Sequence, residues 1–193
     1  MIYDPRTALV VVDMQNDFAD PAGSLSVRGG VQVVAAANAH VAQAAAAGAR
    51  VFYTQDWHPV DTPHFAKDGG AWPVHCVQGT WGAELHPGLD VRGDVVRKGE
   101  HGEDGYSGFT MKDPVSGDST PTPLAERLRA HGVERLVVLG LATDYCVRAT
   151  ALEGRVQGWP VTVPWDAVAA VDLEPGDGER TRAELVEAGV QIT

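Results

Sequence analysis

Cys146 is the residue best suited to covalent chemistry. It follows the run RLVVLGLATDY, where a strand-like segment gives way to a helix-like one. A free thiol has a pKa of about 8.5, so a nucleophilic cysteine needs a nearby base or positive charge to supply thiolate at neutral pH. A helix N-terminus offers positive potential and unpaired N–H groups. Taken alone, Cys146 would be assigned as a small buried hydrophobic residue, because most free cysteines are.

Three charged residues come directly after other strand-like runs. Asp13 follows ALVVV, Asp56 follows VFYTQ, and Lys98 follows VVR. Ligands of open parallel sheets bind beyond the carboxyl ends of the strands, so these side chains should meet Cys146 at one rim. Asp13 can then act as the base and Lys98 as the positive charge. An Asp after a strand is often only a helix cap and a lone Lys is usually solvated, so the combination carries the prediction.

A second group of residues has the chemistry of a metal site. Asp56, His58, His64 and His75 lie within or at the start of one segment. Alternating residues of an extended backbone project to the same side, as Asp56 and His58 would. Imidazole and carboxylate ligands suit zinc, iron and manganese almost equally, so we expect one divalent ion without specifying which. The remaining histidines have no such neighbours and are given no role: His40, His86, His101 and His131.

The elements that must position these residues alternate between two kinds. Strand-like runs rich in β-branched or aromatic residues cover 8–12, 50–54, 95–97, 135–139 and 161–163. Helix-like segments cover 31–48, 123–131, 144–157 and 180–188. This alternation predicts an α/β fold, a doubly wound and mainly parallel sheet with helices on both faces, in one domain spanning residues 1–193.

Two segments break the alternation. Residues 57–86 contain several Pro and Gly residues together with three Trp and four His residues, which predicts a long, ordered and irregular connection. Residues 113–122 form a polar, proline-containing stretch that we expect to be a loop.

Composition argues against several other classes of function. Fifteen Lys and Arg against 26 Asp and Glu give a formal charge of −11, and the basic residues are scattered, so a nucleic-acid partner is not expected. The N-terminal residues lack the pattern of a signal peptide, and no apolar stretch approaches the roughly 20 residues that span a bilayer. We therefore expect a cytoplasmic protein without a membrane partner. In a reducing compartment Cys76 and Cys146 should be free thiols, with Cys76 structural.

Five short stretches stand in order along the chain: VVVDMQNDF, TQDWHP with HF six residues after its His, WPVHCVQGT, a Lys-Gly pair before YSGF, and GLATDYCV. Together they resemble the nicotinamidase/pyrazinamidase branch of the isochorismatase-like cysteine hydrolases. The resemblance runs from about residue 8 to about residue 170. It implies a metal-dependent amidohydrolase that converts nicotinamide to nicotinate and ammonia through a cysteine thioester. Pyrazinamide should also be accepted, because a second ring nitrogen preserves the shape and the metal-binding atom.

The resemblance also implies roles for individual residues. The catalytic triad falls on Asp13, Lys98 and Cys146, the same residues that follow from the strand ends. A cis peptide bond is implied before Ala142, and the N–H groups of Ala142 and Cys146 would form an oxyanion hole. The implied metal ligands are Asp56, His58 and His75, joined by His64, which matches an additional histidine found in part of the family. The implied ring-binding aromatic residues are Phe18, Trp72 and Tyr106, which could also be ordinary core residues.

Three rival functions remain at this point. A related amidohydrolase could use the same triad on a carbamoyl or ureido substrate, although such relatives generally lack the metal loop. Isochorismatase itself does without the nucleophilic cysteine, so Cys146 counts against it. A non-catalytic metal- or ligand-binding protein is the third rival, and the intact triad counts against that. The resemblance leaves both a monomer and a homo-oligomer open.

Overall fold

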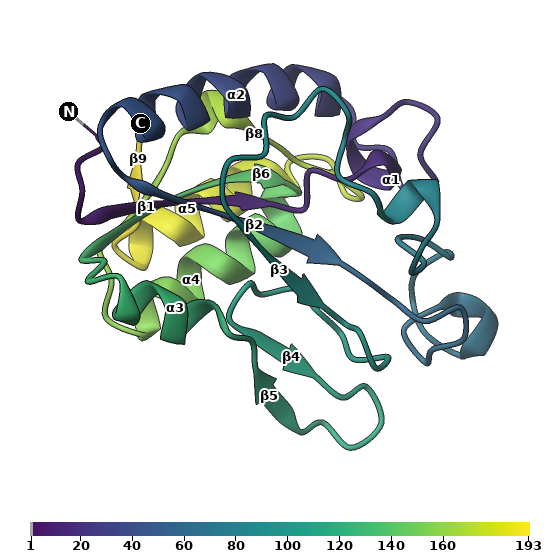
Figure 1. Ribbon diagram of the computed structural model, residues 1–193. Coiled ribbons are helices and arrows are strands. Elements are labelled where there is room, and N and C mark those ends of the chain that lie inside the picture. The colour runs from purple at the N-terminus through teal and green to yellow at the C-terminus, as the bar shows by residue number, and fades with distance from the viewer. Residues whose placement is uncertain (1) are drawn as a thin grey trace.

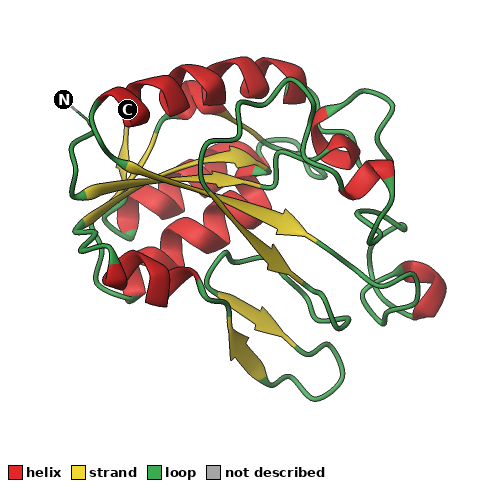
Figure 2. Ribbon diagram, in the orientation of Figure 1, coloured by secondary structure: helices red, strands yellow, loops and turns green. Residues whose placement is uncertain are grey.

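A seven-stranded sheet forms the centre of the computed structural model, which describes residues 2–193 (Figures 1 and 2). The strand order is β3-β2-β1-β6-β7-β9, with β8 beside β6, and every pairing is parallel. The strands are β1 (Thr7–Val12), β2 (Arg50–Asp56), β3 (Asp94–Lys98), β6 (Arg135–Leu141), β7 (Val161–Val163), β8 (Val168–Ala169) and β9 (Gln191–Ile192). The predicted parallel sheet is confirmed.

Helices cover both faces of this sheet (Figures 1 and 2). The long helix α2 packs on one face, and three helices pack on the other. The α-helices are α1 (Asn16–Ala19), α2 (Gly30–Ala46), α3 (Leu124–Ala130), α4 (Arg148–Val156) and α5 (Asp177–Glu187). The four longer helices agree with the helix-like segments of the sequence, which confirms the doubly wound arrangement.

Alternation along the central strand explains why two helical layers form. Within β1, Leu9 and Val11 pack in the core beneath α2, whereas Val10 and Val12 pack in the core beneath α3, α4 and α5. All six residues of β1 are buried. Fully burying a Val or Leu side chain contributes about 1.5–3 kcal/mol, so a strand with apolar residues on both sides is most stable between two layers.

The prediction of a plain loop over residues 113–122 is wrong in part. Ser119–Pro121 forms β5, which pairs antiparallel with β4 (Thr110–Lys112) in a separate hairpin. All three residues of β5 are exposed, so the strand buries no apolar face and leaves no hydrophobic alternation in the sequence. The segment over residues 57–86 is irregular as predicted, with only the single 3₁₀ turns Ala66–Asp68 and Trp81–Ala83.

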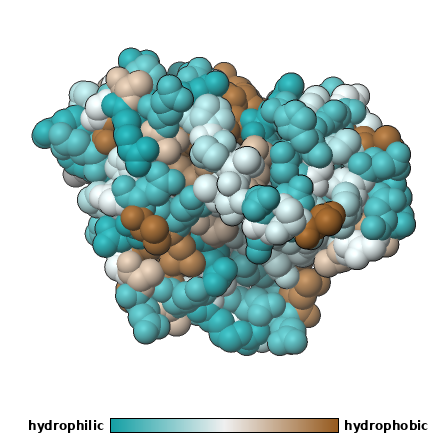
Figure 3. All heavy atoms as spheres, turned by 90° about the horizontal axis from the view of Figure 1, so that it is seen from below, coloured by the Kyte–Doolittle hydropathy of each residue, from teal (hydrophilic) through white to brown (hydrophobic). Residues whose placement is uncertain are grey.

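The surface is mainly hydrophilic on the face seen in Figure 3, where hydrophobic residues gather in small, separate patches. Isolated exposed apolar residues are normal for a folded domain. Among the helices that the structure describes, none has the length and apolar character needed to cross a membrane.

Candidate active site

The carboxyl ends of β1 and β3 bring Asp13 and Lys98 into direct contact. Lys98 Nζ lies 2.7 Å from Asp13 Oδ2 and 3.0 Å from Asp56 Oδ1, and it also donates to the carbonyl oxygen of Gly105. The Lys98 side chain is fully buried. The Cys146 Sγ, a carboxylate oxygen of Asp13 and one of Asp56 all lie within 4.8 Å of one another. The structure therefore assembles the group predicted from the strand ends.

Burial and the neighbouring charges together set the protonation states of this group. Burial alone would lower the pKa of Lys98, but the carboxylates of Asp13 and Asp56 raise it well above its usual value, so the lysine stays charged. Burial raises the pKa of Asp13 to about 6, although Lys98 opposes this shift. Burial likewise raises the pKa of the Cys146 thiol, against the attraction of Lys98. The resting cysteine is thus a thiol beside a carboxylate that can remove its proton.

Two polar residues that were not predicted from the sequence, Thr54 and Gln15, hold the carboxylates in place. Thr54 Oγ1 donates to Asp13 Oδ1 at 2.6 Å and accepts from the Asp13 backbone N–H at 3.2 Å. The buried Gln15 pairs with the Asp56 backbone in both directions, accepting its N–H at 2.8 Å and donating to its carbonyl at 2.7 Å. Gln15 lies in the VVVDMQNDF stretch, but nothing in the residue types shows that its amide would extend the hydrogen bonding of β2.

The three predicted histidine ligands come together in the irregular segment. A ring nitrogen from each of His58, His64 and His75 lies within 4.8 Å of the others, and all three residues are buried. Among the residues that the structure describes, neither ring nitrogen of His58 has a hydrogen-bond partner. A buried polar group without a partner is costly, so these orphaned nitrogens fit a bound ion. Asp56 Oδ2 lies 3.9 Å from His58 Nε2 and joins the cluster to the Lys98 group.

The protonation states of these residues also suit a divalent metal. Burial lowers the pKa of His75 to about 4 and also lowers the pKa of His64, so both rings are neutral at pH 7. Burial alone would raise the pKa of Asp56, but the opposing effects of Lys98 and His58 are larger together. The pKa of Asp56 is therefore lowered, and the side chain is a carboxylate. Three imidazoles and one carboxylate form a donor set typical of zinc, iron or manganese.

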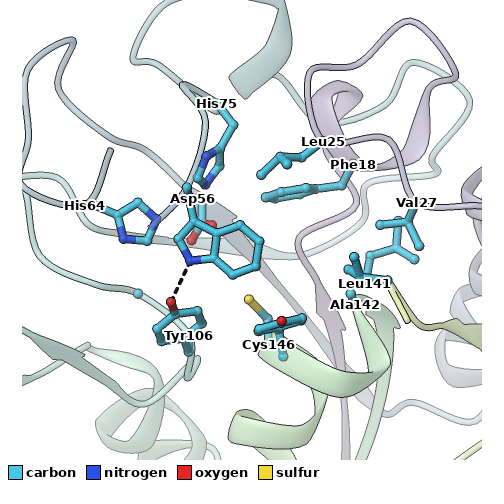
Figure 4. Close-up of a pocket in the computed structure, with 14 residues that line it drawn as sticks. Phe18, Leu25, Val27, Asp56, His64, His75, Tyr106, Leu141, Ala142 and Cys146 are labelled. Carbon is cyan, nitrogen blue, oxygen red and sulfur yellow. Dashed lines mark hydrogen bonds between the residues drawn. The ribbon is translucent and has the colours of Figure 1, made fainter. Parts of the chain in front are cut away.

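One pocket joins the two groups (Figure 4). Cys146 and Ala142 lie at the end opposite His75 and His64, with Phe18 beside His75. The pocket is lined by Phe18, Leu25, Val27, Asp56, His64, Trp72, His75, Gly105, Tyr106, Leu141, Ala142, Tyr145, Cys146 and Val171. All three predicted aromatic residues therefore face the pocket. Trp72 Nε1 donates to the Tyr106 hydroxyl at 2.7 Å, the dashed line in Figure 4, and this contact fixes one wall.

The loop beyond β6 carries the remaining predicted residues. The Leu141-Ala142 peptide bond is cis, as the resemblance implies, and Ala142 lines the pocket with Cys146. Cys146 belongs to a π-helical turn, Thr143–Val147, from which α4 continues. Tyr145 also lines the pocket but was not predicted from the sequence; its ring makes a T-shaped contact with that of Trp72 at 5.0 Å between centroids. Its position next to Cys146 was the available signal.

The isochorismatase domain matches residues 7–191 of the chain. The chain belongs to the isochorismatase family. Within the family, it is 36% identical to a nicotinamidase of Escherichia coli (strain K12) over 206 aligned residues, which cover 97% of this chain and 94% of that protein.

Two solved structures of the family share the whole architecture. The pyrazinamidase of Pyrococcus horikoshii, solved in complex with zinc, has a TM-score of 0.87 and 39% identity, covering 98% of this chain and 99% of that one. PnC1 from L. infantum, solved in complex with nicotinate, has a TM-score of 0.91 and 37% identity, covering 100% of this chain and 95% of that one.

Proposed function

We propose that this protein is a nicotinamidase that hydrolyses nicotinamide to nicotinate and ammonia, and that it also accepts pyrazinamide. The observation that carries the proposal is a single pocket with a buried cysteine–carboxylate–lysine group at one end and a three-histidine cluster at the other. A flat aromatic amide fits between aromatic walls, with its carboxamide toward the cysteine. The substrate is a small molecule, and we place the reaction in the cytoplasm.

The proposed metal ligands are Asp56, His58, His64 and His75, with the ion being zinc, iron or manganese. When bound, the ion would coordinate the ring nitrogen and so hold the ring with its carboxamide beside Cys146. Positioning of this kind lowers a barrier by converting a bimolecular encounter into an oriented one. The aromatic residues Phe18, Trp72 and Tyr106 would hold the ring faces by offset stacking.

The chemical steps belong to the triad. Asp13 accepts the proton of the Cys146 thiol, and the thiolate attacks the amide carbon. The N–H groups of Ala142 and Cys146 would stabilise the oxyanion, each contributing roughly 3 kcal/mol. Asp13 then gives its proton to the amide nitrogen, the C–N bond breaks, and departure of ammonia leaves a thioester on Cys146. Water then attacks the thioester while Asp13 again serves as base, the C–S bond breaks to release nicotinate, and the proton on Asp13 returns to the Cys146 sulfur. Lys98 keeps the carboxylates in place throughout.

Ammonia release from nicotinamide tests this proposal. We expect the purified protein to lose turnover after chelator treatment and to recover it when a divalent metal is restored, because the ring would otherwise lack its anchor. A coupled assay of ammonia before and after each treatment measures the effect. Turnover that is absent in every metal state would contradict the nicotinamidase assignment.

The rate should also fall when Asp13 takes up a proton. Burial raises the pKa of Asp13 to about 6, and only its carboxylate form can accept the thiol proton. Activity is therefore present above this pH and lost below it, with kcat/KM falling about tenfold per pH unit. Because burial lowers the pKa of His75 to about 4, that proposed ligand takes up a proton only at a lower pH than Asp13 does. Metal content measured at each pH separates the two events, and a flat profile between about pH 5 and pH 8 would contradict this role of Asp13.

A carbamoyl or ureido amide is the alternative substrate, since the triad alone would serve it. The buried histidine cluster favours the pyridine ring, because a ring nitrogen gives the metal an atom to hold. Ammonia release across a panel of nicotinamide, pyrazinamide and linear ureido compounds discriminates between the alternatives. A non-catalytic binding protein would release ammonia from none of them.

A further inference from the structure

Asp104 contacts the histidine cluster from the segment between Lys98 and Tyr106. Its Oδ1 lies 2.5 Å from His64 Nδ1. The His64 side chain is 5% exposed and that of Asp104 is 25% exposed, so the pair lies at the edge of the buried cluster. No other hydrogen bond of the His64 ring occurs among the residues that the structure describes.

The backbone of Asp104 is itself fixed. It exchanges two hydrogen bonds with Lys112 of β4, at 2.7 Å and 2.9 Å. The segment that carries Asp104 is also tied to the backbone of His64 through Thr62. The Thr62 Oγ1 donates to the Gly102 carbonyl at 2.8 Å and accepts from the His64 N–H at 3.2 Å. The carboxylate therefore faces His64 from a support that is tied to both the hairpin and the irregular segment.

Histidine chemistry gives this contact a consequence. A carboxylate that accepts the Nδ1–H leaves the lone pair on Nε2, the only other ring nitrogen, and carboxylates in this position also raise the basicity of a ligating imidazole. His75 has the equivalent arrangement, since its Nδ1 lies 2.7 Å from the Pro73 carbonyl oxygen. Two of the three rings are thus held by acceptors on Nδ1, one of them charged.

We propose that Asp104 is a positioning residue that fixes the tautomer and orientation of His64 and thereby makes it a strong metal ligand. This inference rests on the metal site of the proposed function and adds to it a residue outside the ligand set. It also assigns a task to β4, which anchors Asp104 at the edge of the cluster.

Zinc affinity of the metal-free protein provides the first test, with zinc itself as the probe in competition with a chelating dye. Asp104→Ala should weaken binding about 10- to 100-fold, the usual effect of removing such a partner. Glu100→Ala is the matched control, because it removes an exposed acidic side chain from the same segment and should leave the affinity unchanged. Unchanged affinity in Asp104→Ala would overturn the proposal.

A double-mutant cycle shows whether Asp104 acts through His64. In the His64→Ala background, Asp104→Ala should cause no further loss of zinc affinity, since the residue through which it acts is gone. An equal loss in both backgrounds would overturn the proposal. Because zinc binding does not require nicotinamide, a protein that shows this cycle but no ammonia release would retain the inference and lose the proposed substrate.

The tautomer provides a spectroscopic test that needs no variant. NMR of the metal-free wild-type protein with ¹⁵N-labelled histidine rings should place the neutral proton of His64 on Nδ1. The Nε2–H form should gain population in Asp104→Ala, a change that general destabilisation would not produce. A His64 proton on Nε2 in the wild-type protein would overturn the proposal even if the alanine variant did not fold.

Discussion

Cys146→Ala is expected to reduce nicotinamide turnover by about four orders of magnitude or more while metal content stays unchanged. The thiol is the atom that would form the thioester, and removal of a nucleophile that acts with its base as a unit leaves only binding and oxyanion stabilisation. The sulfur lies at the end of the pocket opposite His75, so its loss leaves the histidine cluster intact (Figure 4). Single-turnover ammonia release and elemental metal analysis measure the two quantities.

Cys76→Ala is the matched control for this experiment. Cys76 is also a buried free cysteine, but its sulfur is directed toward the Gly82 carbonyl at 3.9 Å and does not line the pocket. Its backbone N–H donates to Asp17, a contact that alanine retains. Activity close to wild type is therefore expected. Full activity in Cys146→Ala would remove the nucleophile assignment, because no thiol would remain at the reacting end.

The rule that ligands bind beyond the ends of parallel strands predicted most of the triad geometry. It applies to Asp13 and Lys98 because each directly follows a run whose apolar residues mark a strand. The order of the strands was not predicted, and in the structure β2 lies between β1 and β3, so the direct contact of Lys98 with Asp13 could not be read from the sequence. The prediction that Cys146 joins them required the further assumption of a turn after β6, and the structure places Cys146 in a π-helical turn there.

The supporting residues could not be predicted in the same way. Thr54 lies inside a strand, where a polar residue of this size can face a helix layer or a carboxylate, and the sequence does not distinguish these surroundings. Asp104 lies in an acidic segment without periodicity, so the sequence does not distinguish it from acidic neighbours that are exposed to solvent. The exposed strand β5 was missed because a strand that buries no apolar face leaves no pattern. The residue types and the family resemblance both indicated the three histidines, but the hydrogen-bond acceptors of their rings depend on tertiary contacts.

Lys98→Met is expected to lower the free energy of unfolding of the metal-free protein by about 3–5 kcal/mol, the cost of removing one partner from a buried ion pair. Methionine keeps much of the side-chain volume, so the loss reports the charge. The variant leaves the carboxylates of Asp13 and Asp56 buried within 4.8 Å of each other without the cation between them. Urea denaturation at neutral pH measures the change.

The pH dependence of this loss identifies its cause. Burial already raises the pKa of Asp13 to about 6. Without Lys98, that pKa should rise further and the folded-state pKa of Asp56 should rise above its unfolded value, so both carboxylates oppose folding at neutral pH and this opposition fades as acid protonates them. The difference between Lys98→Met and wild type should therefore shrink as the pH falls. Lys67→Met is the control, because Lys67 contacts Asp61 and Asp68 at 2.6 and 2.7 Å on the surface, where solvent screens the charges. An equal change in both variants would show that burial of the Lys98 charge does not stabilise the fold, whereas a loss confined to Lys98→Met would mean that the triad lysine also maintains the structure of the site.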